Sequence, residues 1–535
     1  MNRRDFIQES LLYVGVAATI TACKQPSQRV IPGRIVGASA SVGHLLRDGR
    51  FPDPVSQIEK EVVIVGGGVS GLSAARQLVR KGITDIALLD LEEKVGGNAA
   101  SGSNSVSAYP WGAHYLPIPN TNLTEYMDFL TEIGVISGTD AQGLPIYNDY
   151  YLCFDPQERL YIHGRWQEGL VPQAGVPEAD RQQIDRFLAL MDHYRYLIGK
   201  DGKEAFALPV DRSSKDPELV LLDQLTMQQW MEVQRFTSAY LHWYVNYCTR
   251  DDFGTRLQEV SAWAGIHYFA CRKGKGVGVS HQDVLTWPEG NGWLVGQLQR
   301  SLPEKPLTRS VVTRIQTDNE AVVVHYYDVF TKEVKAIRAQ QCIVAVPQFI
   351  AARLLNDTKR IAQVQKHLHY VPWMVANLKV KRLEERNGAP LSWDNVLYES
   401  ESLGYINATH ELVSQPGLYQ NLTYYLPLTK NSPLMARRAA QAKTHAEWVS
   451  EIFQDLEKVH VNLAQQTEEV NIMLWGHAMV QPLPGLIHGA VREELSASIG
   501  NRIHFAHTDL AGVSLFEEGF YQGLQAANKV MNQLT

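Results

Sequence analysis

The feature that most constrains the fold is a glycine-rich turn that directly follows a run of β-type apolar residues. Residues 62–65 read Val-Val-Ile-Val, and the next six read Gly-Gly-Gly-Val-Ser-Gly. Residues 70–81 have the pattern of a helix that ends at Gly82, and residues 83–89 read as a second strand that stops at Asp90. A G-x-G-x-x-G turn in this strand–helix–strand context is typical of dinucleotide binding.

Each residue of this turn has its own expected role. Gly66 permits the tight turn, Gly68 lets the backbone approach a pyrophosphate, and Gly71 lets the helix pack closely on the strand. The helix N-terminus faces the phosphates, and the Asp90 carboxylate can hold a ribose hydroxyl. The residues of this segment expected to bind the dinucleotide are Gly66, Gly68, Val69, Ser70, Gly71, Asp90 and Leu91.

A Gly-Gly pair follows the second strand. The chain continues from Asp90 as Leu-Glu-Glu-Lys-Val-Gly-Gly-Asn. This pattern resembles the flavoprotein superfamily of amine oxidases and phytoene-desaturase-like enzymes, in which a Gly-Gly pair lies beside the FAD. The resemblance implies that Gly96, Gly97 and Asn98 contact FAD, whereas NAD-binding domains do not usually carry this pair.

Later segments fit the same superfamily. By the same resemblance, the strand expected at residues 307–315 would contact the adenine end through Val311 or Val312. Residues 342–347 read as a buried parallel strand that ends in Ala-x-Pro. Residues 502–509 followed by a glycine-bearing helix resemble the C-terminal FAD motif, although His507 stands where glycine is usual. The contacts implied in these segments are Val312, Asp509, Gly519, Phe520 and Tyr521.

The distribution of these motifs predicts an α/β fold with a discontinuous, Rossmann-like FAD-binding domain and a mixed α+β substrate domain. The FAD-binding domain is expected over residues 61–110, 275–350 and 480–535, and the substrate domain over residues 111–274 and 351–479. No second G-x-G-x-x-G follows a strand, so a second domain for NAD(P)H is not expected.

The start of the chain resembles an export signal. Arg3 and Arg4 precede an apolar run that leads into Cys23, a pattern similar to a twin-arginine signal with a lipobox. We therefore expect a signal over residues 1–23, a linker over residues 24–60, recognition by the twin-arginine translocase, and a periplasmic or cell-envelope protein anchored to the membrane by a lipid on Cys23. A disordered terminus or a short membrane helix is the alternative.

Net charge and cysteine spacing indicate which partners and bound groups are not expected. The net charge is −7 without a basic stripe, so nucleic acid is not an expected partner. Besides Cys23, four cysteines lie far apart without a C-x-x-C pair, so neither a disulfide framework nor a metal site is expected.

Catalytic residues are hard to identify because FAD itself accepts the hydride and the protein mainly positions the substrate. In related flavoproteins the region after the Gly-Gly loop returns to the flavin, with Gly112 and Ala113 allowing close approach. His114 and His477 are candidates for a base or a flavin contact, and for each a structural role is an equally good alternative.

Two departures from amine oxidases affect the reading of the site. Asn377 best matches the position of a family lysine, with Lys379 the alternative if the register is shifted. The two aromatic positions that enclose the amine in the family correspond best to His477 or Ala478 and to Phe520. The catalytic candidates are therefore His114, His477 and Phe520.

The leading interpretation is an exported FAD-dependent oxidoreductase that transfers a hydride from a C–N or C–C bond of a small or apolar substrate to FAD. A redox-neutral flavin isomerase and a desaturase that uses a membrane acceptor are alternatives. An FAD-bearing protein that binds a partner without turnover is a third.

Overall fold

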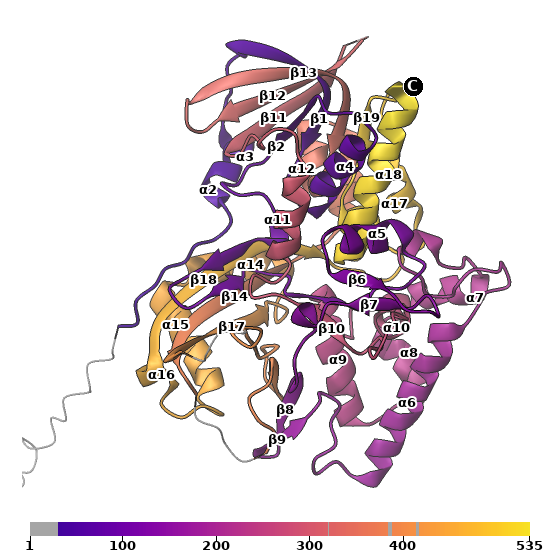
Figure 1. Ribbon diagram of the computed structural model, residues 1–535, viewed down its shortest axis with the longest axis vertical. Helices are drawn as coiled ribbons and strands as arrows, with labels where there is room; N and C mark the ends of the chain where they lie inside the picture. The colour runs from indigo at the N-terminus through magenta and orange to yellow at the C-terminus, as the bar shows by residue number, and fades with distance from the viewer. Residues whose placement is uncertain (1–29, 319, 384–387, 413–416, 535) are drawn as a thin grey trace, which may run out of the picture.

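Two β-sheets organise the computed structural model, which describes residues 30–318, 320–383, 388–412 and 417–534 (Figure 1). In the first sheet the strands have the order β11-β12-β13-β1-β2, and β19 also pairs with β13. The bounds are β1 Ser56–Val65, β2 Ile86–Leu89, β11 Ser310–Thr317, β12 Val322–Asp328, β13 Glu333–Val344 and β19 Ile503–Phe505. Strands β2, β1, β13 and β19 run parallel, which confirms the predicted α/β fold.

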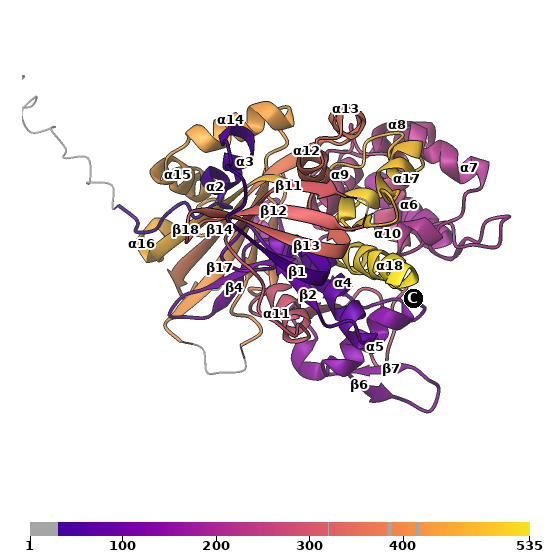
Figure 2. The same ribbon diagram turned by 90° about the horizontal axis from the view of Figure 1, so that it is seen from above.

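Helices α4 (Val69–Arg80) and α18 (Phe516–Leu534) lie side by side against this sheet (Figure 2). Residues 62–65 of β1 are buried on both faces of the sheet, as expected for a parallel strand covered by helices. The helices approach each other closely because α18 carries glycine: a Cβ on Gly523 would lie 2.3 Å from the carbonyl oxygen of Ser70.

The second sheet has the strand order β18-β14-β17-β16-β15-β8-β9. Its bounds are β8 Glu158–Ile162, β9 Arg165–Glu168, β14 Tyr370–Lys381, β15 Asp394–Leu397, β16 Tyr405–Asn407, β17 Tyr419–Pro427 and β18 Thr467–Val480. Alternation along β14 divides its two faces. Met374, Ala376 and Leu378 belong to the core formed with α15 (His445–Leu456), whereas Trp373 and Val375 belong to the larger core formed with α9 (Ala239–Phe253) and α10 (Ala262–Ala270).

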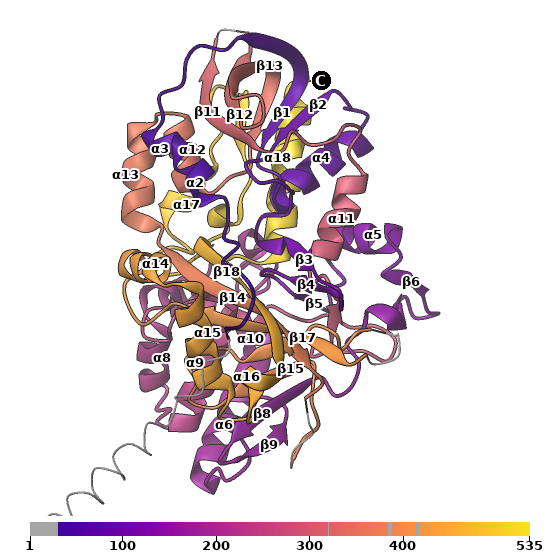
Figure 3. The same ribbon diagram turned by 90° about the vertical axis from the view of Figure 1, so that its left-hand side faces the viewer.

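The described part of the predicted linker, residues 30–60, contains two short helices and paired backbone. The Val36 N–H donates to Ile472 O at 2.7 Å, and α2 (Ala40–Gly43) and α3 (Leu45–Asp48) lie between the two sheets (Figure 3). Strand β1 begins at Ser56, which pairs with Lys335, so the sheet starts before the expected boundary at residue 61. Paired backbone needs no side-chain period, which explains why the pattern of residues 30–60 did not reveal it.

Replacing Gly71 by alanine should test the close contact of α4 with β1. A Cβ at Gly71 would lie 1.9 Å from Gly66 O and 3.3 Å from the Ala345 side chain. We expect G71A to lower the free energy of unfolding by about 1–3 kcal/mol, as in an overpacked core, and to reduce the amount of FAD retained. Denaturant unfolding and the visible absorbance of the purified protein measure the two effects.

Gly296 offers a matched control, because it lies in α11 (Gly292–Arg300) and a Cβ there would meet nothing within 4 Å. G296A should keep FAD and hold or raise the stability, by up to about 1 kcal/mol. Equal behaviour of the two variants would contradict the steric explanation.

Candidate active site

A cavity of about 250 Å³ lies between the glycine-rich turn and the N-terminal end of α18. It brings together residues that the sequence places in five separate segments. Predicted cofactor contacts that line it are Gly66, Gly68, Val69, Ser70, Asp90, Gly96, Gly97, Asn98, Ala113, Asp509 and Gly519. The convergence of these segments on one cavity is the geometry that a dinucleotide requires.

The backbone of the turn fits a phosphate-binding role. Gly66 has φ +107° and a Cβ there would lie 2.4 Å from Ala345 O, so both the conformation and the space require glycine. Gly68 precedes the first residue of α4, and a Cβ there would meet nothing within 4 Å, so its backbone is open to the cavity. The N–H groups at this helix start are therefore accessible to a pyrophosphate.

Asp90 is held in place by the backbone on both sides. Gly67 N–H donates to Oδ2 and Glu92 N–H donates to Oδ1, each at 2.7 Å. Burial raises the pKa of Asp90 to about 6 despite these bonds. Asp90 also lines a neighbouring cavity of about 400 Å³ together with Leu91 and Val312, which is the expected position of the adenosine end.

Asp509 is the most strongly supported acid of the cofactor cavity. Its Oδ2 accepts from the Tyr370 hydroxyl at 2.6 Å and from Gln348 N–H at 2.8 Å, and its Oδ1 lies 3.1 Å from His507 Nδ1. Burial alone would raise the pKa of Asp509, but His507 and these hydrogen bonds outweigh it and hold the pKa below its ordinary value. The His507 ring thus has a structural reason to stand where the family usually has glycine.

A separate cavity of about 150 Å³ adjoins the cofactor cavity and shares Asn98, Ala113 and Ala478 with it. Most of its wall is apolar or aromatic, and it also contains four charged side chains at one end. The residues that give it this character are His114, Tyr115, Trp373, Tyr425, Trp475, Asp251, Asp252, Arg272 and Glu517. A largely apolar cavity with a few charged groups is typical of a small-molecule site.

The two candidate histidines lie in different places. His114 lines the 150 Å³ cavity and packs against Tyr425, with ring centroids 4.7 Å apart. His477 lines the cofactor cavity and packs against Phe349 at 4.5 Å. Burial lowers the pKa of each to about 4, and Arg437 contributes at His477, so both rings are neutral near pH 7.

The structure places Phe520 and Tyr521 away from these cavities. Phe520 is fully buried against Tyr126 and Phe129, with ring centroids 5.2 and 5.6 Å away, and the Tyr521 hydroxyl donates to Glu125. Neither is among the described residues that line the cavities, whereas Phe516, one turn earlier in α18, lines both. The expected wall is therefore displaced by one helical turn.

Asn377 also lies beyond the cavity wall. Its Nδ2 donates to Pro110 O at 2.9 Å and its Oδ1 accepts from the Thr423 hydroxyl at 2.7 Å. The residues of β14 that line the cavity are Trp373 and Val375. Lys379, the alternative, reaches Ser105 at 3.0 Å. No lysine is among the described residues that line the 150 Å³ cavity.

The acidic end of this cavity was not predicted from the sequence. Arg272 lies 3.7 Å from the Asp252 carboxylate and 3.4 Å from that of Glu517. Asp251 has no ion-pair or hydrogen-bond partner among the residues that the structure describes, and burial, together with Asp252 and Glu158, raises its pKa to about 8. Adjacent acids at a helix end usually face water, so the residue pattern did not indicate that Asp251 lines a cavity.

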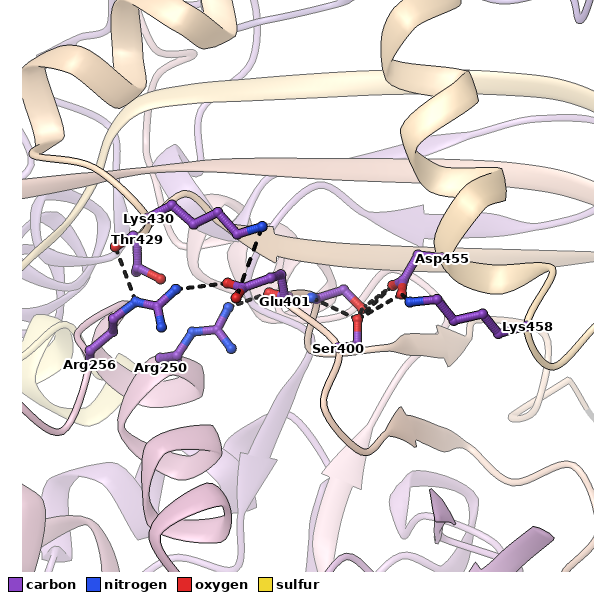
Figure 4. Close-up of polar contacts among 9 residues, drawn as sticks. Arg250, Arg256, Ser400, Glu401, Thr429, Lys430, Asp455 and Lys458 are labelled. Atoms are coloured by element: carbon purple, nitrogen blue, oxygen red, sulfur yellow. Dashed lines mark hydrogen bonds and ion pairs between the residues drawn. The ribbon is translucent and has the colours of Figure 1, made fainter. Parts of the chain in front are cut away.

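A polar network fixes the end of α9 that carries these acids (Figure 4). Arg250 donates to Glu401 O, and Arg256 lies 2.7 Å from the Glu401 carboxylate. The neighbouring Ser400 donates to Asp455 on α15 at 2.8 Å. Helix α9 then ends in left-handed Gly254, where a Cβ would lie 2.7 Å from Trp373 Nε1. The network therefore sets where Asp251 and the cavity wall lie.

Residues 69–531 match the family of flavin containing amine oxidoreductases. The chain belongs to this family. The family and the fit of the glycine turn, Asp90 and Asp509 to a dinucleotide identify the cofactor as FAD and the protein as an FAD-dependent oxidoreductase. The predicted resemblance to amine oxidases is thereby confirmed.

Individual relatives are distant from this amine oxidoreductase. The oxidoreductase PigB of Serratia sp. is 23% identical over 96% of this chain and 80% of its own length. Putrescine oxidase of Kocuria rosea is 27% identical over 35% of this chain and 34% of its own length. Among solved structures, a putrescine oxidase bound to putrescine has a TM-score of 0.65 at 15% identity, and cyclohexylamine oxidase from Brevibacterium oxydans has 0.63 at 16%. Both cover 89% of this chain and their whole length, and they show the fold.

The raised pKa of Asp251 predicts a pH-dependent stability. An acid with a pKa of about 8 in the folded chain and about 4 in the unfolded chain binds its proton more tightly when folded. Stability is therefore lost as the pH rises from about 4 to 8. We expect D251N to remove this loss and to be more stable than the wild type near pH 8 by on the order of 1 kcal/mol.

Thermal unfolding at several pH values measures the difference. D185N, at an exposed acid on α6 (Glu178–Tyr196), serves as the control and should follow the wild type. If D251N and the wild type lose stability in parallel between pH 5 and 8, Asp251 does not bind its proton as described.

Proposed function

We propose that the protein oxidises a small amine with an apolar body, taking a hydride from the carbon beside the nitrogen. The observation that carries this proposal is the position of Asp251, an acid without a protein partner in a largely aromatic cavity that adjoins the FAD cavity. A substrate ammonium group would supply the missing counter-charge. A neutral hydrocarbon substrate would leave this carboxyl group buried without a partner, which is costly.

The walls of the cavity support the same substrate class. Tyr115, Trp373 and Tyr425 offer ring faces and edges that suit both an apolar body and a cation. Arg272 lies within 3.7 Å of both Asp252 and Glu517, which share it, whereas Asp251 has no ion-pair partner among the described residues and is the acid left for a ligand. A volume of about 150 Å³ fits a compact molecule rather than a long chain.

The protein would position FAD and the substrate and exclude water from them, rather than supply a strong base. The glycine turn, Asp90 and Asp509 would hold FAD, which supplies the two-electron acceptor when bound. Neutral His114, with its pKa near 4, can orient the substrate nitrogen by a hydrogen bond but is a weak base. In the empty site Asp251 holds its proton. A bound ammonium group would lower the pKa of Asp251, so that its proton leaves to solvent. The carboxylate could then accept a proton from the ammonium group, which frees the nitrogen lone pair before the adjacent C–H bond breaks.

Oxygen consumption and peroxide release over a panel of primary, secondary and cyclic amines test this proposal. We expect a compact amine to reduce the FAD and to be turned over. D251N should raise KM by about tenfold or more, since a charge-assisted contact contributes about 1.5–3 kcal/mol, while D185N should behave as the wild type.

The alternatives give different results in the same assay. FAD reduction that is followed by electron transfer to a quinone rather than to oxygen would indicate a dehydrogenase or desaturase. Conversion of a substrate without peroxide or dye reduction would indicate an isomerase. If no amine bleaches the FAD, the proposal of amine oxidation is wrong and a partner-binding role is favoured.

We further propose that the protein is exported and lipid-anchored. Support comes from Arg3, Arg4 and Cys23, which lie outside the described residues. Within the part of the chain that the structure describes, no helix is both long and apolar enough to cross a membrane. A twin-arginine signal would suit this protein because that route carries folded proteins, and FAD would be loaded before export.

Cell fractionation of the native host tests the proposal. Replacing Arg3 and Arg4 by lysine should leave the protein in the cytoplasm, and C23S should release it from the membrane fraction. K24Q, next to Cys23, is the control and should keep the wild-type distribution. An unchanged distribution of the arginine variant would contradict export by this route.

A further inference from the structure

A cluster of three potential metal ligands lies outside the two cavities of the active site. Cys153 follows the short helix η2 (Asp149–Tyr151), and His410 and Glu411 follow strand β16. One ligand atom from each of the three side chains lies within 4.8 Å of the others. Cys153 and Glu411 are buried, and His410 is partly exposed.

Glu411 shows that this cluster is electrostatically incomplete. The residue is 7% exposed, and neither carboxylate oxygen has a hydrogen-bond partner of good geometry. The Thr286 hydroxyl, the Cys153 thiol and the Phe154 N–H are near enough to interact with this carboxylate. The Thr286 hydroxyl is itself buried without a partner. Burying a polar group without a partner costs free energy. The Glu411 carboxylate therefore needs a hydrogen-bond donor or a cation beside it.

One ring nitrogen of His410 has a hydrogen-bond partner in the protein. Its Nε2 lies 2.9 Å from Phe154 O, so an Nε2–H that donates to this carbonyl leaves the lone pair on Nδ1. A carbonyl that fixes the tautomer and the ring in this way is usual behind metal-bound histidines. His410 also lines a polar cavity of about 460 Å³, which gives an ion a path from solvent.

We propose that Cys153, His410 and Glu411 bind a divalent cation of the zinc type. A thiolate, an imidazole and a carboxylate form a mixed set that suits Zn²⁺, with water or Thr286 in the fourth position. Zinc–ligand bonds of about 2.0–2.3 Å require the three atoms to move closer together than 4.8 Å. On binding, the Cys153 thiol gives its proton to solvent and the sulfur bonds to the metal.

The position of the site gives it a structural role. Cys153 N–H donates to Val284 O of β10 (Val284–Thr286), and the chain that leaves β10 reaches Asn291, which lines both active-site cavities. A metal would join this segment to the turn after β16. The separated cysteines argued against a metal site in the sequence, because the fold, and not a local spacing, brings these ligands together.

Metal content and spectroscopy of the FAD-loaded protein test the proposal. After reduction of thiols, incubation with Zn²⁺ and dialysis, we expect about one zinc per chain. X-ray absorption should show one sulfur at about 2.3 Å together with lighter ligands at about 2.0–2.1 Å. Co²⁺ should give a thiolate charge-transfer band in the difference spectrum against the cobalt-free protein.

Variants separate ligation from folding. Loss of a residue that only hydrogen-bonds to a metal ligand weakens metal binding by about 10–100-fold. C153S and E411Q each remove a ligand and should therefore weaken Zn²⁺ binding by more than this. C153S should also remove the sulfur contribution from the X-ray absorption spectrum. C342S, at a buried cysteine of β13, and E399Q, at an exposed acid, are the matched controls. The FAD content of each variant reports whether it is folded.

Two outcomes would overturn the site. One is wild-type protein that retains no zinc under reducing conditions and gives no cobalt charge-transfer band. The other is C153S that binds zinc as tightly as the wild type while it retains its FAD. Either result would mean that Glu411 is satisfied by Thr286 and Cys153 alone.

Discussion

The close approach of helix α4 to strand β1 is the contact on which both active-site cavities depend. Gly71 permits it, since any side chain there would overlap Gly66 O. Gly523 permits a similar close contact between α18 and α4, since a side chain there would overlap Ser70 O. These contacts bring the starts of the two helices to the same cavity, although the helices come from opposite ends of the chain. Backbone packing, rather than side-chain chemistry, thus positions the cofactor site.

Burial away from water sets the protonation states of the titratable side chains around these cavities. It favours the neutral form of every titratable group, so His114 and His477 lose their protons and Asp251 keeps its own. Asp509 stays ionised because its carboxylate accepts two hydrogen bonds and lies beside the His507 ring. The contrast between Asp509 and Asp251 distinguishes an acid that the protein satisfies from one left for a ligand.

The sequence predicted the cofactor side of the site far better than the substrate side. The expected roles of Gly66, Gly68 and Asp90 depend on local backbone geometry, so a linear motif is enough to find them. Asp509 was found from a motif as well, but its partners Tyr370 and Gln348 come from distant segments. Asp251 and Trp373 meet only through the packing of α9 on β14, which no spacing in the chain encodes. Phe520 was predicted to line the substrate site but lies in the core. The reason is the same, because one turn of a helix decides whether a ring lines the cavity or packs in the core.

The contact between Ser39 and Glu92 holds the segment before β1 at the wall of the cavity expected to contain the adenosine end of FAD. Ser39 donates to both carboxylate oxygens of Glu92, through its N–H at 2.9 Å and its hydroxyl at 2.7 Å. Residues around it, including His44 and Leu46, line the same cavity as Asp90. A cleavage in this N-terminal segment would therefore remove part of the wall of the cavity expected to hold the adenosine end of FAD, so the segment before β1 contributes to cofactor retention as well as to the connection between the sheets.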